Sequence, residues 1–203
     1  MPSSVTLQPY TTTVSASSFL LQTDGFVQGT FVDSPVTRYT LEGGYVAASQ
    51  LTPIWGGLPL SLAVPAPGQG GASSGLGPAA TVATTAASIN AWCLLNQAAA
   101  GIITPSSNSP LFTSGGSLNF ARVLSDMLIV LPVNPAAVNT LANASATYPI
   151  YWNFAQNYVD ITGSTPLGYQ IIALNTNSKT ITYSSTTGFA NWTPGGSVIV
   201  VRI

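Results

Sequence analysis

The sequence is poor in the side chains on which most enzymes depend. It contains no histidine and a single cysteine, and charged residues make up only 4% of its 203 positions, against roughly 25% in an ordinary soluble domain. General acid–base catalysis draws mainly on histidine, carboxylates and lysine. A zinc or two-metal site needs several ligands close together. We therefore expect a protein that is not an enzyme and that holds neither a metal nor a cofactor.

Positive charge is equally scarce. A protein that binds nucleic acid replaces the phosphate counterions with clustered lysine and arginine. Arg38, Arg122, Lys179 and Arg202 are too few and too scattered to build such a patch. A membrane-spanning helix needs about 20 consecutive apolar residues, whereas the longest aliphatic run is Met127–Leu131. We expect neither nucleic acid nor a membrane as a partner.

The formal net charge of −1 removes the mutual repulsion that keeps dissolved molecules apart. A surface of Ser, Thr, Asn, Gln, Ala and Gly is therefore typical of a chain that ends up packed against other chains. Hydrophobic residues reach 46%, which is enough for a core and is the opposite of the balance in disordered chains. Cys93 has apolar neighbours, so we expect a buried thiol and not a reactive one.

Short apolar segments alternate with Gly, Pro, Asn and Ser turns, which indicates an all-β fold. We expect a sandwich or barrel of short antiparallel strands, with at most one or two short helices, one of them around Pro135–Ala142. The expected strands include Tyr45–Val46, Leu58–Val64, Ile89–Leu95, Leu118–Val123, Met127–Leu131, Ile150–Phe154, Tyr158–Thr162, Tyr169–Leu174, Lys179–Tyr183 and Ser197–Ile203.

Two further patterns refine this expectation near the C-terminus. Asn175–Ser178 is typical of a hairpin turn, and Thr193–Gly196 is typical of a turn before the last strand. Both faces of that last strand, Ser197–Ile203, are largely apolar. Such a pattern predicts a strand that is buried on both sides.

The chain is expected to have an extended N-terminal arm, residues 1–41, followed by a β-rich domain, residues 42–203. Residues 65–78 are rich in Pro and Gly and indicate a flexible loop. If the chain has an internal domain boundary, it is expected in that loop. The arm is extended and poor in turns at Pro9–Leu21, so we expect it to order on a neighbouring subunit by strand addition.

One short motif resembles a catalytic element. Gly71–Gly75 matches the G-x-S-x-G pattern, with Ser73 in the place of the nucleophile. That motif needs a preceding strand, a following helix and a histidine base. The chain has no histidine, and the motif lies in the Pro/Gly-rich stretch. A hydrolase is therefore the least favoured class.

Aromatic side chains are the remaining candidates for recognition. Trp152, Tyr151 and Trp192 are candidates for a carbohydrate-binding platform, although positions in the core are the more common fate of such residues. Trp55 lies between a proline and a pair of glycines on an expected loop, where a large aromatic ring needs a cover. We assign Trp55 to a partner interface, together with Tyr10, Phe19 and Leu20 of the arm.

Three segments carry a resemblance to a known family: Ile54–Gly57, Phe112–Phe120 and Thr187–Trp192, the last before a C-terminal β-strand. With the low-charge composition rich in Ala, Gly, Thr and Ser, residues 44–203 resemble the cement or decoration proteins of tailed-bacteriophage heads. The resemblance implies a β-rich protein, assembled as dimers or trimers on the outside of the capsid. There it would hold neighbouring major capsid subunits together against the pressure of the internal DNA. The family has no catalytic residues to carry over.

On this interpretation the chain is synthesised in the host cytoplasm and becomes part of the virion on the capsid exterior. Its expected partners are the major capsid protein and copies of itself. A tail, baseplate or adhesin subunit is the first alternative, since such proteins share the β-rich style. Tail fibres usually show internal repeats, and none is evident here, which favours the head. A carbohydrate-binding module is the alternative from a different class.

Overall fold

The computed structural model describes residues 26–30, 41–64, 77–95, 109 and 111–203. Within these ranges lie ten β-strands and one α-helix of a single turn, so the predicted all-β class is confirmed. The strands are β1 (Leu41–Val46), β2 (Pro59–Ala63), β3 (Ala79–Val82), β4 (Ala91–Cys93), β5 (Ser117–Arg122), β6 (Leu128–Pro132), β7 (Tyr151–Asn153), β8 (Tyr158–Asp160), β9 (Gln170–Ser184) and β10 (Phe189–Arg202).

The single α-helix of the described residues lies where the sequence predicts one, and a separate 3₁₀ turn lies at Ala86–Ser88. Asn134 begins the predicted helical segment, because the Asn134 side chain accepts a hydrogen bond from the backbone N–H of Ala136. A 3₁₀ turn, Pro135–Ala137, leads directly into α1, Val138–Leu141. Proline in the first helical turn sacrifices no hydrogen bond. None of the helices in the described ranges is long and apolar enough to cross a membrane.

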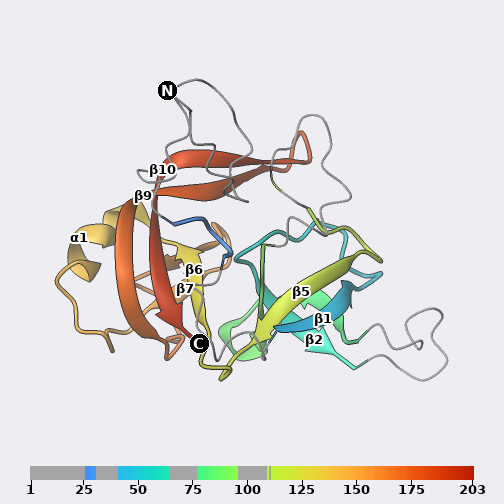
Figure 1. Ribbon diagram of the computed structural model, residues 1–203, viewed down its shortest axis with the longest axis horizontal. Coiled ribbons are helices and arrows are strands. Elements are labelled where there is room, and N and C mark those ends of the chain that lie inside the picture. The colour runs from blue at the N-terminus through green and yellow to red at the C-terminus, as the bar shows by residue number, and fades with distance from the viewer. Residues whose placement is uncertain (1–25, 31–40, 65–76, 96–108, 110) are drawn as a thin grey trace, which may run out of the picture.

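The first five strands close into a barrel in the order β1-β3-β2-β4-β5, which forms the right-hand half of the molecule in Figure 1. Neighbouring strands run antiparallel, except that β1 and β3 run parallel. Closure leaves no strand edge open to another chain. The Pro/Gly-rich stretch joins β2 to β3, which are antiparallel neighbours in this barrel. The strands on either side of this stretch therefore belong to one folded unit, which leaves no place for a domain boundary between them.

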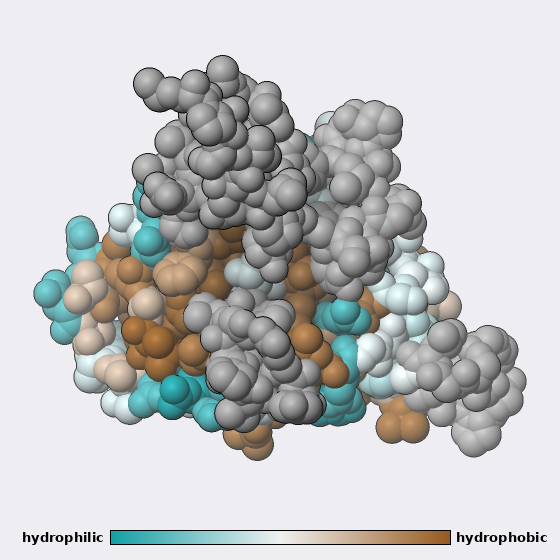
Figure 2. Space-filling view, viewed as in Figure 1, coloured by the Kyte–Doolittle hydropathy of each residue, from teal (hydrophilic) through white to brown (hydrophobic). Residues whose placement is uncertain are grey.

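The other half holds a three-stranded sheet in the order β6-β10-β9 and a two-stranded sheet of β7 and β8. β10 is the central strand of the three-stranded sheet, and, as predicted, it is buried on both faces between Val198 and Val201. Ile199 and Val201 join the main core, whereas Val198 and Val200 form a second, smaller cluster with Val130. Figure 2 shows hydrophobic side chains gathered over this half of the molecule.

Strands β9 and β10 are longer than predicted, because two expected turns are absent. Asn175–Ser178 lies inside β9, where Oδ1 of Asn175 accepts hydrogen bonds from the backbone N–H of Asn177 and the hydroxyl of Ser178. Thr193–Gly196 lies inside β10 at a shift in the pairing register, with Gly195 at φ +73°. A β-bulge uses the same Gly and Pro residues as a turn. The hairpin instead turns at residues 185–188.

One continuous hydrophobic core joins the two halves. Trp92 of the barrel donates a hydrogen bond from Nε1 to the hydroxyl of Tyr169 at 2.8 Å. Its ring also meets that of Trp152 edge-on, with 5.0 Å between the ring centroids. Cys93, next to Trp92, is fully buried as predicted, and this burial raises the pKa of its thiol. The barrel and the sheets therefore form one folded unit.

Residues 26–30 lie between the barrel and the sheets, and Figure 1 shows them as the dark blue segment. Gln28 donates its backbone N–H to the carbonyl of Lys179 in β9, and Gly29 donates to the carbonyl of Val130 in β6, each at 2.9 Å. The backbone N–H of Leu95 donates to the carbonyl of Gly29 on the barrel side. This short segment thus covers an edge of β9 and an edge of β6.

The position of residues 26–30 corrects the predicted N-terminal arm. Gln28 is only 1% exposed, and Val27 is also buried. These residues belong to the folded unit and not to an extended arm that comprises all of residues 1–41. Tyr10, Phe19 and Leu20, the interface residues predicted in the arm, lie outside the described residues.

Candidate functional site

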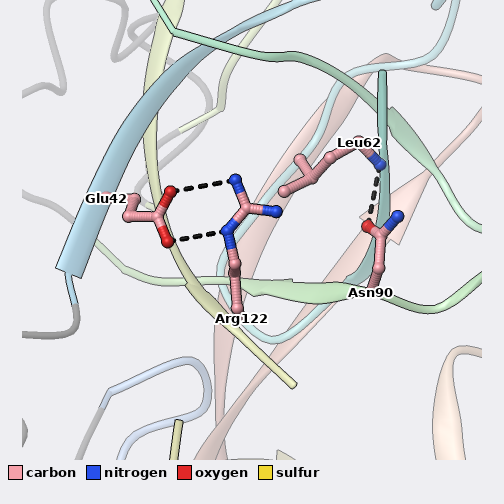
Figure 3. Close-up of polar contacts among 4 residues, drawn as sticks. All are labelled: Glu42, Leu62, Asn90 and Arg122. Carbon is pink, nitrogen blue, oxygen red and sulfur yellow. Dashed lines mark hydrogen bonds and ion pairs between the residues drawn. The ribbon is translucent and has the colours of Figure 1, made fainter. Parts of the chain in front are cut away.

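The charged side chains of the barrel are occupied with one another. Arg122 donates from Nε to Oε1 of Glu42 at 2.7 Å and from Nη2 to Oε2 at 3.0 Å. Figure 3 shows this two-pronged pair, which joins β1 to β5. The hydrogen bonds with Glu42 raise the pKa of the guanidinium group. Close by, Asn90 accepts a hydrogen bond from the backbone N–H of Leu62. These contacts fasten barrel strands together.

The carboxylates of the other half are also engaged. Asp126 forms an ion pair with Arg202 at 3.3 Å between Oδ1 and Nε. Asp160 accepts hydrogen bonds from the side-chain amide of Asn134 and from the backbone N–H of Ile161. In the described part of the chain, no three His, Cys, Asp or Glu side chains gather closely enough to hold a metal ion. Asp126 and Asp160 therefore each hold parts of the fold in contact.

Trp55 is buried within the chain, whereas its assignment to a partner interface expected an exposed ring. Its side chain is only 6% exposed. Its ring stacks on that of Tyr183 in β9, with 4.8 Å between centroids and 25° between planes. The cover that a large aromatic ring needs on a glycine-rich loop thus comes from within the chain. The prediction that a partner supplies this cover is wrong, because a distant strand folds back onto the loop.

The aromatic residues proposed as a carbohydrate platform are divided by the fold. Tyr151 and Trp152 lie together on β7 and line a groove of about 410 Å³, whereas Trp192 is not among its lining residues. Phe154 completes the aromatic wall. Trp152 is buried against Trp92, so Tyr151 and Phe154, which are partly exposed, present more of their surface to the groove.

The groove forms where the two halves of the molecule meet. One wall is β7 with its turn, Tyr151–Phe154, and a second is the loop Thr162–Thr165. The barrel half supplies a further wall through residues 84–87. The lining residues include four threonines, a serine and an asparagine, and none is charged. The arrangement can therefore offer hydroxyl and amide groups beside aromatic rings, without an acid or a base.

Local contacts hold each wall in place. A Cβ atom added at Gly163 would lie 2.7 Å from Cβ of Tyr151, so the absence of a side chain there lets the tyrosine pack closely against the loop. Oδ1 of Asn153 accepts hydrogen bonds from the backbone N–H groups of Ala155 and Gln156 at 3.1 Å, which fixes the turn after β7. On the barrel side, Ser88 donates its hydroxyl to the carbonyl of Thr85 at 2.8 Å.

A second, smaller cavity of about 280 Å³ lies nearby and is lined by Tyr148, Tyr169 and neighbouring residues. Burial raises the pKa of Tyr169 to about 12, and the hydrogen bond from Trp92 opposes this rise. Trp92 contacts the rings of both Trp152 and Tyr169, one from each cavity. The same aromatic cluster therefore includes a lining residue of each cavity.

Sequence reasoning identified the aromatic wall of the groove and missed its hydroxyl-bearing rim. Thr84 and Thr85 are far in the sequence from Thr162 and Thr165, and no local pattern distinguishes them from other threonines of this Thr-rich chain. Comparison of the chain with protein-family models, curated proteins and solved structures finds no match. The function proposed below therefore rests on the composition, the fold and the arrangement of residues.

Proposed function

We propose that the chain is a virion structural protein that binds the outside of a bacteriophage capsid lattice and stabilises it. The observation that carries this proposal is a folded β-protein with almost no charge available for chemistry. Glu42, Arg122, Asp126 and Arg202 form two ion pairs, and Asp160 holds backbone and amide donors. Such a protein acts through contacts between surfaces, and these five charged side chains hold parts of its own fold together.

The way in which strand edges are paired or covered supports a role in assembly. A chain with so little charge lacks the repulsion that normally limits self-association, and an exposed strand edge would template uncontrolled pairing. Here five strands close into a barrel. Residues 26–30 form hydrogen bonds with the edges of β6 and β9 at Val130 and Lys179. Neutral faces thus remain for contact, which favours ordered packing on a lattice over aggregation.

The assignment to the head rests on the resemblance of residues 44–203 to cement and decoration proteins. The partners under this proposal are the major capsid protein and further copies of the chain, as a dimer or trimer. A stable protein–protein contact buries about 1,600 Å² in total, and the capsid symmetry would repeat that contact over the whole shell. Apolar and neutral polar surface provides the stabilisation, since burial of apolar area is favourable by about 25 cal/mol per Å².

The test is co-sedimentation of the purified full chain with empty heads and, separately, with isolated tails of the particle that carries it. We expect saturable binding to heads, with a copy number that matches the symmetry of the lattice. Binding to tails alone would contradict the capsid assignment and favour a tail, baseplate or adhesin subunit. Binding to neither would refute the structural role in the virion.

A truncated chain tests the role proposed for the N-terminal arm. Deletion of residues 1–21 removes the turn-poor segment together with Tyr10, Phe19 and Leu20, and stops short of the buried segment 26–30. We expect the shortened chain to keep its circular dichroism spectrum and to lose binding to heads. Unchanged binding would show that the arm is not the element that holds the lattice.

A further inference from the structure

We propose that the groove between β7 and the barrel is a binding site for a neutral carbohydrate. This inference goes beyond the proposed structural function, and it stands on the groove alone. The groove measures about 410 Å³, which lies within the range of about 300–1,000 Å³ found for small-molecule sites. Its walls combine aromatic rings with a rim of hydroxyl groups.

The aromatic wall matches the apolar side of a sugar ring. Tyr151, Trp152 and Phe154 come from one short stretch of chain and line the same groove. A pyranose presents C–H groups on its faces, and these pack on aromatic rings, whose bodies are apolar while the edges of Tyr and Trp stay polar. Tyr151 and Phe154 retain partly exposed rings, as such a contact requires.

The rim matches the hydroxyl groups at the edge of the same ligand. Thr84 and Thr85 line the groove from the barrel side, and Thr162, Ser164 and Thr165 line it from a loop of the other half, and all five are exposed. A hydroxyl both donates and accepts hydrogen bonds, as each sugar hydroxyl does. The two rows thus offer partners to a ligand whose hydroxyl groups point outward all around its ring.

Because the lining of the groove has no charged side chain, it favours uncharged ligands over anionic ones. None of the lining residues is Asp, Glu, Lys or Arg. Recognition of a sulfate, phosphate or carboxylate group typically uses Arg or Lys, whose charge-assisted hydrogen bonds are about twice as strong as neutral ones. An anionic glycan would lose its hydration in this groove without such a partner. The chemistry therefore favours uncharged hexoses and N-acetylhexosamines.

The groove is also held ready for a ligand. Gly163 packs on Tyr151, and the side chain of Asn153 fixes the turn that carries Phe154. Trp152 is held edge-on by Trp92 at 5.0 Å between centroids. Preformed walls reduce the ordering cost of binding. The second cavity, which is lined by Tyr148 and two prolines, has fewer hydroxyl groups on its walls and serves as the control site.

The first experiment applies the labelled full chain to an array that carries neutral oligosaccharides of glucose, galactose, mannose and N-acetylhexosamines, together with sialylated and sulfated glycans. We expect binding to one or more neutral glycans and no preference for the charged ones. Binding to no glycan would overturn the proposal. Binding confined to the sialylated or sulfated glycans would also overturn it, because the lining offers no cation to them.

The second experiment locates the site by titrating the strongest neutral array glycan against variants and following tryptophan fluorescence. Tyr151→Ala is expected to raise the dissociation constant by about tenfold, which corresponds to about 1.4 kcal/mol, because it removes an aromatic ring that would pack on the ligand. Tyr148→Ala, in the second cavity, is expected to stay within about twofold of the wild-type value. An equal effect of the two substitutions would place the site elsewhere and overturn the proposal.

A third variant keeps the test decisive if Tyr151→Ala does not fold. Thr165→Val removes one exposed rim hydroxyl and keeps the shape of the side chain. We expect it to preserve the thermal melting temperature and to weaken glycan binding by about threefold to tenfold, as for the loss of one hydrogen bond. Unaltered binding by a folded Thr165→Val protein would contradict a role for the rim.

Discussion

Gln28 is the side chain whose removal should reveal most about how the two halves are joined. It is 1% exposed and lies between β9 and the loop that carries Trp55. Its Oε1 accepts a hydrogen bond from the backbone N–H of Ile181 at 2.8 Å. Its Nε2 donates to the carbonyl of Gly56 at 3.1 Å. One buried amide therefore satisfies a donor of the sheet and an acceptor of the barrel.

The proposed perturbation is Gln28→Met, which keeps a long unbranched side chain and removes both hydrogen bonds. A buried donor or acceptor that loses its partner costs about 1–3 kcal/mol. Two such groups, at Ile181 and Gly56, give about 2–6 kcal/mol, and local relaxation and the more apolar methionine reduce this sum. We expect the free energy of unfolding to fall by about 2–4 kcal/mol, against a total of about 5–15 kcal/mol for a typical domain.

The assay is urea unfolding followed by tryptophan fluorescence, with thermal melting as a second readout. For a chain of this size each kcal/mol lowers Tm by about 2–4 °C. Gln156→Met is the matched control, because Gln156 is exposed and its side chain supports no other element. Its effect should stay within about 0.5 kcal/mol. A Gln28→Met loss no larger than that of the control would refute the role assigned to this amide.

Three further predictions follow from the described contacts. The thiol of an unfolded chain has a pKa of about 8.5, whereas burial raises the pKa of the Cys93 thiol in the folded protein. The protonated Cys93 thiol therefore contributes its full share to the free energy of unfolding below about pH 8.5, and this share is lost as the pH rises further. The free energy of unfolding, from urea titrations at pH 7, 9 and 10, should fall by up to about 1.4 kcal/mol per pH unit above that point, and a slope that Cys93→Ala leaves unchanged would contradict this. Arg122→Ala should cost only about 0.2–1 kcal/mol in the same assay and less in high salt, because the pair with Glu42 is about half exposed; a larger loss would show that the pair is a main support of the barrel. Gly29→Ala should destabilise the fold strongly, because a Cβ there would overlap the backbone of Gly56 and the residue has φ +77°; a melting temperature equal to that of the wild type would contradict this packing.

Much of the secondary structure could be predicted because its signals are local. The apolar residues on both faces of Ser197–Ile203 identify a central strand without any knowledge of its neighbours. The position of Pro135 predicts the start of the helical segment that contains α1, the one α-helix in the described residues. The apolar neighbours of Cys93 predict its burial. In each case the residue and its immediate neighbours contain the information.

Where the same residues fit both a turn and a β-bulge, the prediction from sequence alone was wrong. Asn175–Ser178 and Thr193–Gly196 contain the residues of turns, yet both lie within long strands. The pairing of β9 with β10 on both sides of each segment decides this outcome. Glycine and proline fit a bulge as well as a turn, so only the register of the partner strand distinguishes them.

The candidate site shows the same division. The sequence by itself determined a charge-poor β fold, and it identified Tyr151 and Trp152, which line the groove, as candidates for recognition. Only the tertiary structure decided that Trp55 stacks on Tyr183, that Thr84 lines the groove and that Trp192 does not. These are contacts between distant parts of the chain. Composition and periodicity indicate which side chains of a segment are buried. Which other segment they pack against is decided only when the whole core forms.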